Sequence, residues 1–185
     1  SRGLGDVYKR QGRRRALPDH RHLVADRDRR RDDRTDAGGK RHMQSLAAMA
    51  HVDFNDPTAY SYEQALLVMR QLRLPMAQLE EQFRRMVFNV VARNQDDHVK
   101  NIAYLMDRQG QWSLSPAFDI TWAYNPDGDW TARHQMSING KREGFDLADL
   151  AACAATASIN ARRARDIIEQ VRQSVLRWPQ FADQA

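Results

Sequence analysis

Apolar side chains recur at intervals of three and four residues along much of the chain after residue 60, and this spacing predicts helices. The longest such stripe consists of Met76, Leu79, Phe83, Met86, Val87, Val90 and Val91. Pro75 precedes the stripe, at a position where proline is tolerated because the first helical amide has no intrahelical partner. We therefore expect a long, largely buried helix that runs from Pro75 to Arg93.

The same spacing predicts further helices on both sides of this one. Ser61 is a suitable N-cap for a helix that ends near Leu72. His42 to Ala50 also has helical spacing. After Phe145-Asp146, two C-terminal helices are expected over about 147–157 and 160–176.

Between Asn101 and Asp119 the pattern changes to short apolar and aromatic runs. Ile102 to Met106 and Trp112 to Leu114 predict two strands, joined by a turn in which Gly110 can take a positive φ. Because the two ends of a hairpin lie side by side, we expect Asp96, Asn101 and Asp119 to come together at one spot. The expected fold is mainly α with a small β-hairpin.

The net charge of +5 is unevenly distributed along the chain. Residues 1–41 hold 14 Lys and Arg against 7 Asp and Glu, and the remaining residues hold 15 against 17. The later region therefore lacks the basic footprint that nucleic-acid binding requires. We expect no direct nucleic-acid binding by this region.

Residues 1–34 are rich in Arg and Asp and show no apolar period. Such a segment cannot bury enough apolar surface to order itself, so one interpretation is a disordered basic arm. The other, which we favour, is a non-native leader, translated from adaptor sequence and from the wrong reading frame. We therefore treat 1–34 as a leader and 35–185 as the folded domain.

Neither a membrane segment nor a disulfide is expected. The longest apolar runs, such as Ala151 to Ala155, are much shorter than the ~20 residues that span a bilayer. Cys153 is the only cysteine, which fits a reducing compartment, and its Ala-rich surroundings favour core packing over reactivity. We expect a cytoplasmic protein.

Asp96, Asn101 and Asp119 have the spacing of the phosphoryl-transfer residues in kinases. In that chemistry one Asp orients the attacking hydroxyl, while an Asn five residues later and a second Asp hold Mg²⁺ against the nucleotide phosphates. The pattern indicates a site for ATP and Mg²⁺. A hydrolytic metal centre formed by Asp96, His98 and Asp119 is a weaker alternative.

Three motifs carry a resemblance to a known family. They are Asp96-x-His98-x-Lys100-Asn101, Leu114-Ser115-Pro116-Ala117-Phe118-Asp119-Ile120 and His134-x-Met136-Ser137-Ile138-Asn139-Gly140-Lys141. From about Thr35 to Trp178 the chain resembles the C-terminal lobe of HipA-like serine/threonine kinases, which include the toxins of HipBA toxin–antitoxin modules. The resemblance implies that Asp96 is the catalytic base and that Asn101 and Asp119 are metal ligands. It also implies a protein substrate and a helix-turn-helix antitoxin partner.

The neighbouring residues have less certain roles. We interpret Asp97 as a solvated or capping neighbour. His98, our second catalytic candidate, is expected to support the loop through a hydrogen bond rather than by titrating. Lys100 either contacts a nucleotide phosphate or faces water, and packing is the default role for His134 and Lys141.

The family's N-terminal lobe, with its nucleotide-covering loop and strand lysine, has no counterpart that we recognise in this sequence. We therefore expect a C-terminal fragment that is inactive alone, although the full-length parent would be a kinase. Two alternatives stay open. The parent could phosphorylate small molecules or lipids, as aminoglycoside phosphotransferases and lipid kinases do, or the chain could serve only as a partner-binding lobe.

Overall fold

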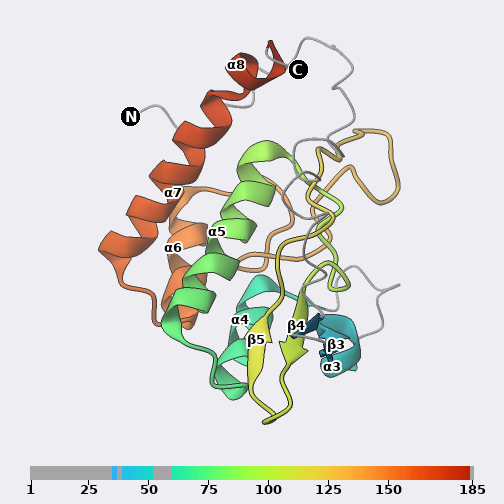
Figure 1. The fold of residues 1–185 in the computed structure, drawn as a ribbon. Helices are drawn as coiled ribbons and strands as arrows, with labels where there is room; N and C mark the ends of the chain where they lie inside the picture. The colour runs from blue at the N-terminus through green and yellow to red at the C-terminus, as the bar shows by residue number, and fades with distance from the viewer. Residues whose placement is uncertain (1–34, 37–38, 52–59, 184–185) are drawn as a thin grey trace.

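The computed structural model describes residues 35–36, 39–51 and 60–183 (Figure 1). The main helices are α4 (Tyr62–Gln71), α5 (Met76–Ala92), α6 (Leu147–Thr156) and α7 (Ala161–Leu176). The strands β3 (His42–Ser45), β4 (Ala103–Met106) and β5 (Trp112–Leu114) form one antiparallel sheet. The shorter elements are β1 (Thr35–Asp36), β2 (Gly39–Lys40), α3 (Leu46–Met49) and α8 (Trp178–Ala182).

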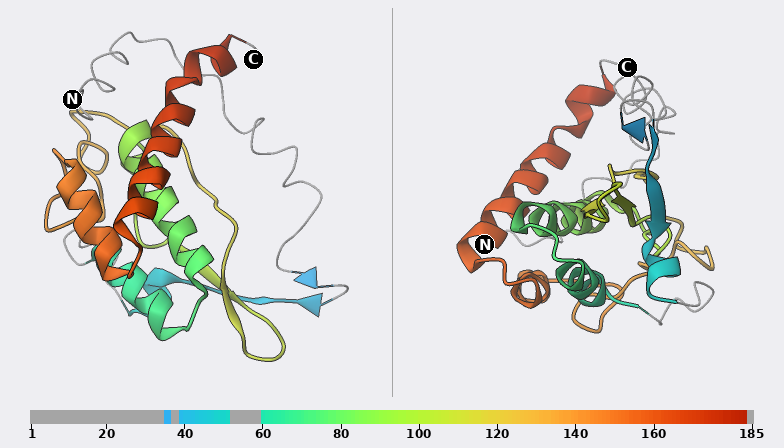
Figure 2. Two further views of the ribbon diagram at one scale, coloured as in Figure 1. Left: turned by 90° about the vertical axis from the view of Figure 1, so that its left-hand side faces the viewer. Right: turned by 60° about the horizontal axis from the view of Figure 1, so that its bottom comes forward.

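Helix α5 forms the centre of the core. It packs against α7 and α4, while α6 lies against both α4 and α7, and the views in Figure 2 show this bundle beside the sheet. Phe83, Met86, Val87 and Val90 on α5 are fully buried. Each such side chain contributes roughly 1.5–3 kcal/mol by leaving water. The predicted apolar stripe therefore forms the core, although Met76 at its start is exposed.

Local sequence signals set the helix ends. Ser61 and Gln64 form a capping box at the start of α4, with each side chain bonded to the other residue's backbone amide. Asp146 and Asp149 form the corresponding box at α6. Helix α5 ends at Arg93, which has a left-handed backbone (φ 56°) and donates its amide to the Asn89 carbonyl. These helices lie where the sequence predicted them.

The sheet is larger than the predicted hairpin. It has the order β3-β4-β5, with Met43 opposite Leu105 and Leu105 opposite Ser113. The prediction of a helix over His42 to Ala50 was therefore wrong for its first half. Ser45 ends the strand and caps the short helix α3, where its hydroxyl accepts from the Ala48 amide. Pairing with β4 outweighs the weak helical preference of His42–Ser45.

Two further sequence expectations concern the core and the membrane. Cys153 is fully buried, and its Sγ lies 3.5 Å from Met86 Sδ, so it packs in the core as predicted. Within the described ranges, none of the helices has the length and apolar character needed to span a bilayer. The predicted leader, residues 1–34, lies outside the described residues.

Candidate active site

The candidate site begins where α5 ends. After Arg93 the chain enters a loop, residues 94–101, that we call the catalytic loop. Its start pairs with the segment after Asp119, because the Gln95 amide donates to Ala123 O at 2.9 Å and the Ala123 amide donates to Arg93 O at 3.1 Å. The loop is therefore fixed against a segment that follows the second predicted metal ligand.

Asp97 lies at the buried side of this loop. Its Oδ1 accepts from the Gln135 amide at 2.8 Å, and its Oδ2 accepts from the Tyr62 hydroxyl at 2.8 Å. His134 Nδ1 also lies 2.8 Å from Oδ2. The Asp97 side chain has no exposed surface. The prediction of a solvated or capping residue was wrong, since Asp97 binds two distant segments of the chain.

Asp96 faces the opposite way. Its side chain is 45% exposed, whereas its carbonyl oxygen accepts from Asn101 Nδ2 at 3.0 Å. His98 Nε2 lies 3.8 Å from Asp96 Oδ1, a distance beyond hydrogen-bond range. His98 Nδ1 is buried without a hydrogen-bond partner. We predicted that His98 would support the loop through a hydrogen bond. In this structure Asp97 makes such hydrogen bonds instead.

Asp119 lies after the hairpin, which returns the chain to the site. Past the end of β5, the Ser115 amide donates to Ala103 O and the Ser115 carbonyl accepts from Arg85 Nη1, both at 2.9 Å. Asp119 is exposed and has a φ of 55°, a left-handed conformation that is uncommon outside glycine. Arg93 at the end of α5 has the same backbone conformation, so the φ of Asp119 by itself assigns no role to this residue.

A small cavity of about 20 Å³ lies between the catalytic loop, α5 and residues 117–120. His98, Asn101 and Asp119 all line it, so the structure brings these three predicted site residues together. A cavity of this size holds about one water-sized body. Asp96 is not among its lining residues, although its carboxylate lies 3.8 Å from the His98 ring.

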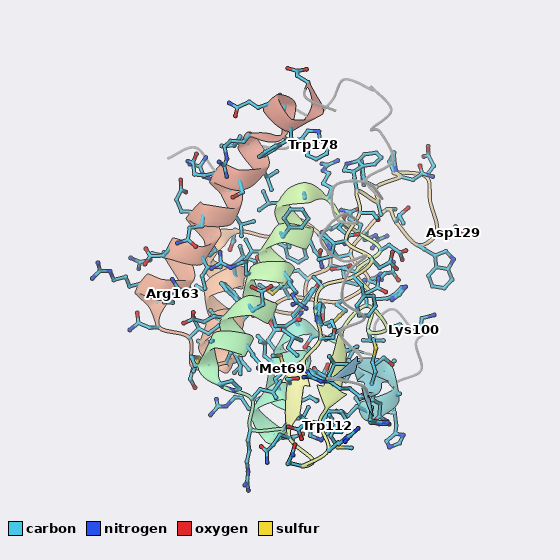
Figure 3. All side chains as sticks on the ribbon, in the orientation of Figure 1. Met69, Lys100, Trp112, Asp129, Arg163 and Trp178 are labelled. Atoms are coloured by element: carbon cyan, nitrogen blue, oxygen red, sulfur yellow. The ribbon has the colours of Figure 1, made fainter. Side chains whose placement is uncertain are left out.

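Lys100 lies outside this cavity. Its side chain is exposed, and Figure 3 places it at the edge of the molecule, away from the helical core. The structure therefore does not bring Lys100 into the cavity with Asn101 and Asp119.

The alternative of a hydrolytic metal centre is contradicted. Among residues 35–36, 39–51 and 60–183, no three His, Cys, Asp or Glu side chains are placed to hold a metal ion together. Asp96, His98 and Asp119 therefore do not form such a group.

A buried polar network behind Asp97 was missed by sequence reasoning. The Tyr62 hydroxyl accepts from Asn89 Nδ2 at 2.9 Å, and Asn89 Oδ1 accepts from Asn94 Nδ2 at 3.0 Å. Burial and the adjacent Asp97 carboxylate raise the pKa of Tyr62 well above its usual value. The motif from His134 to Lys141 was the available signal, but its partners are too distant in sequence to be inferred.

The same motif fixes α6 through a second buried carboxylate. Asp149 accepts from Asn139 Nδ2 at 2.9 Å, Lys141 Nζ at 2.8 Å and the Asp146 amide at 2.9 Å. Burial opposes ionisation of Asp149, but these donors outweigh it and lower its pKa to about 2. Lys141 therefore forms an ion pair, and the default expectation of simple packing was incomplete.

Comparison with known families gives the class of the protein. The model of the HipA-like C-terminal domain matches residues 12–178, so the chain belongs to the HipA-like C-terminal domain family. The match begins inside the segment 1–34, whose separation from the rest of the chain stays a prediction. A search among curated proteins found no match.

A solved structure supports the same fold. The chain is similar to a protein in the complex of Shewanella oneidensis MR-1 toxin–antitoxin proteins HipA and HipB with their operator DNA. The TM-score is 0.64 at 16% sequence identity, and the match covers 79% of this chain. It covers 37% of the Shewanella chain, so the present chain spans little more than a third of that protein's length.

Proposed function

We propose that this chain is the catalytic-loop lobe of a kinase that transfers the γ-phosphoryl group of ATP to a serine or threonine hydroxyl of a protein. The main support is that Asn101 and Asp119 line one cavity, with Asp96 in the same loop. A loop Asp, an Asn five residues later and a second Asp are the parts that phosphoryl transfer requires.

The donor atoms around the cavity suit Mg²⁺. Asn101 uses its amide nitrogen to bind the Asp96 carbonyl, and this orientation leaves its oxygen, with the Asp119 carboxylate, for a cation. Carboxylate and amide oxygens are the protein ligands that Mg²⁺ accepts, usually together with water and phosphate oxygens. When bound, Mg²⁺ would neutralise negative charge on the phosphates.

In this proposal Asp96 orients the acceptor hydroxyl and takes its proton. Its partial exposure leaves the carboxylate accessible to a hydroxyl on another molecule. The His98 ring lies beside Asp96, with its Nε2 at 3.8 Å from Asp96 Oδ1. Lys100 precedes Asn101 in the catalytic loop and lies outside the cavity, and in this proposal its exposed side chain contacts a nucleotide phosphate there.

The test uses the protein expressed from its complete gene, with Asp119→Ala and Asn101→Ala as variants and Arg108→Ala, in the exposed hairpin turn, as the control. Loss of a metal ligand removes electrostatic stabilisation of the transition state, so we expect kcat to fall by at least ~10². Incorporation of labelled phosphate into protein measures this. Activity of Asp119→Ala within about threefold of the wild type would reject the assignment.

The substrate and partner are part of the same proposal. Label that enters only small molecules or lipids, after incubation of labelled ATP with lysate, would favour the alternative kinase classes. The similar Shewanella protein comes from a toxin–antitoxin complex with operator DNA, which supports an antitoxin as partner. That this partner is a helix-turn-helix protein is what the family resemblance implies. We assign direct DNA contact to that partner because the folded region is slightly acidic. We propose a cytoplasmic location because a single cysteine fits a reducing compartment.

A further inference from the structure

We propose that Asp97 is a positioning residue that holds the catalytic loop in one conformation and so aims Asp96 at the acceptor. This role concerns a residue distinct from the base and the metal ligands. Its catalytic consequence rests on the proposed kinase function, but its structural consequence does not.

The geometry of Asp97 gives the loop three attachments at one carboxylate. Tyr62 comes from the first turn of α4, while His134 and Gln135 come from the segment before α6. The Tyr62 hydroxyl is itself held by Asn89 of α5. Asp97 thus bonds the catalytic loop directly to two segments of the fold and, through the Tyr62 hydroxyl, indirectly to α5.

The burial of Asp97 fixes the loop backbone and thereby the orientation of the Asp96 side chain. The Asp97 side chain is fully buried, whereas the preceding Asp96 side chain is 45% exposed, so the two carboxylates leave the backbone toward opposite sides. Asn101 holds the backbone between them by donating to the Asp96 carbonyl. If Asp97 were released, the bond from Asn101 to the Asp96 carbonyl would have to hold this part of the loop.

The surroundings of Asp97 require an acceptor at both oxygens. Oδ1 meets the Gln135 amide, and Oδ2 meets the Tyr62 hydroxyl and the His134 ring. Asn at this position has nearly the same shape but carries one NH₂ group. In place of Oδ1 this group would face the Gln135 backbone N–H, which can only donate, and in place of Oδ2 it would require the His134 ring to change tautomer or the Tyr62 hydroxyl to reorient. A buried donor without an acceptor costs its desolvation, so the loop would move away to regain water contacts.

If Asp97 only stabilised the fold, its substitution would lower global stability without a specific effect on the catalytic loop. Asp149 provides a matched control for this possibility. Asp149 is an equally buried carboxylate with three donors, but its donors lie around the start of α6 rather than at the loop. Asp97→Asn and Asp149→Asn therefore remove the same chemical group from two comparably satisfied sites.

The experiment compares these two variants in the protein expressed from its complete gene, by hydrogen exchange and by steady-state kinetics. For Asp97→Asn we expect amides 94–101 to exchange about tenfold faster while those of α6 are unchanged, and kcat to fall about tenfold with the KM for ATP within twofold. Asp149→Asn should show the reverse exchange pattern and an unchanged kcat at a temperature where it stays folded.

His134 provides a milder pair of variants should Asp97→Asn fold poorly. In His134→Asn the side-chain NH₂ can replace the Nδ1 donor to Asp97, whereas His134→Leu has no donor. Retained loop protection in His134→Asn and its loss in His134→Leu support the proposal. Unchanged exchange at 94–101 in both Asp97→Asn and His134→Leu, or equal acceleration throughout the protein, overturns it. A wild-type protein that transfers no phosphate would reject the proposed function, while the exchange data would still decide the role of Asp97.

Discussion

The hydroxyl of Tyr62 donates to the carboxylate of Asp97 at 2.8 Å, although 35 residues separate the two in sequence. The bond joins the start of α4 to the catalytic loop inside the core. Another fully buried tyrosine, Tyr104, has a hydroxyl with no hydrogen-bond partner among the residues that the structure describes. The two tyrosines therefore have similar burial but opposite hydrogen-bonding states.

Replacing each tyrosine with phenylalanine should have different effects on stability. Tyr62→Phe removes a donor from Asp97 and leaves Asn89 without its acceptor, so we expect a loss of about 1–3 kcal/mol. Tyr104→Phe removes an unpaired buried hydroxyl and should be neutral or slightly stabilising. Urea unfolding of both variants measures the difference. Equal destabilisation of the two would contradict the assigned network.

Asp149 should make stability depend on pH in the acid range. Its pKa is about 2 in the folded protein, against a usual 3.8, so the unfolded chain binds the proton more readily. The resulting stabilisation, about 2 kcal/mol, is present above pH 4 and is lost as the pH falls from 4 to 2. Urea midpoints across this range should fall less steeply in Asp149→Asn than in the wild type.

Glu169 is the control for this prediction. Hydrogen bonds from Arg172 and Gln173 lower its pKa to about 2, but its side chain is 54% exposed. Salt screens exposed ion pairs far more than buried ones. In about 0.5 M salt the effect of Asp149→Asn should persist, and that of Glu169→Gln should largely disappear.

Arg85 should influence activity through the position of Asp119. Its guanidinium binds the Ser115 carbonyl and Glu81, which ties the segment before Asp119 to α5. Arg85→Met should loosen this segment and lower kcat/KM about tenfold, with a higher Mg²⁺ requirement. Arg84→Met is the control, because Arg84 on the same helix binds Gln170 of α7 and Glu81. Similar losses in both variants would indicate damage to α5 rather than displacement of Asp119.

The isolated chain of residues 1–185 should bind ATP with Mg²⁺ only weakly. The cavity beside Asn101 and Asp119 holds about 20 Å³, so it can admit an ion or a water but not a nucleotide. Mg²⁺ is held weakly when phosphate oxygens do not complete its coordination. We expect a Kd in the millimolar range, about −4 kcal/mol, by calorimetry. A micromolar value would assign a nucleotide-binding surface to this chain.

The helices and the hairpin could be predicted because their signals are local. Ser61, Pro75 and Gly110 mark a cap, a helix start and a turn within a few residues of the elements that they define. Strand β3 was missed because the spacing of Met43, Leu46 and Ala47 fits a helix as well as a strand followed by a helix. Only β4, some 60 residues later, decides between them.

The candidate site likewise contains residues that local sequence could predict and residues that it could not. Asp96, Asn101 and Asp119 were expected to converge because a hairpin joins the last two; Asn101 and Asp119 line one cavity, but Asp96 does not line it. The burial of Asp97 could not be predicted, since its partners Tyr62 and His134 are 35 and 37 residues away. A carboxylate next to another carboxylate looks solvated in sequence until the donors that surround it are known.

The hairpin between Asn101 and Asp119 has the candidate site at one end and its turn at the other. Tyr104 pairs with Leu114 next to the site end of the strands, while Asp107 to Gln111 turn at the other end, toward the bottom of Figure 1. Strand register, rather than the number of intervening residues, therefore sets the separation of the two candidate ligands. The turn is thus a suitable place to insert a reporter peptide or fluorophore, since lengthening it leaves the register and the distant cavity unchanged.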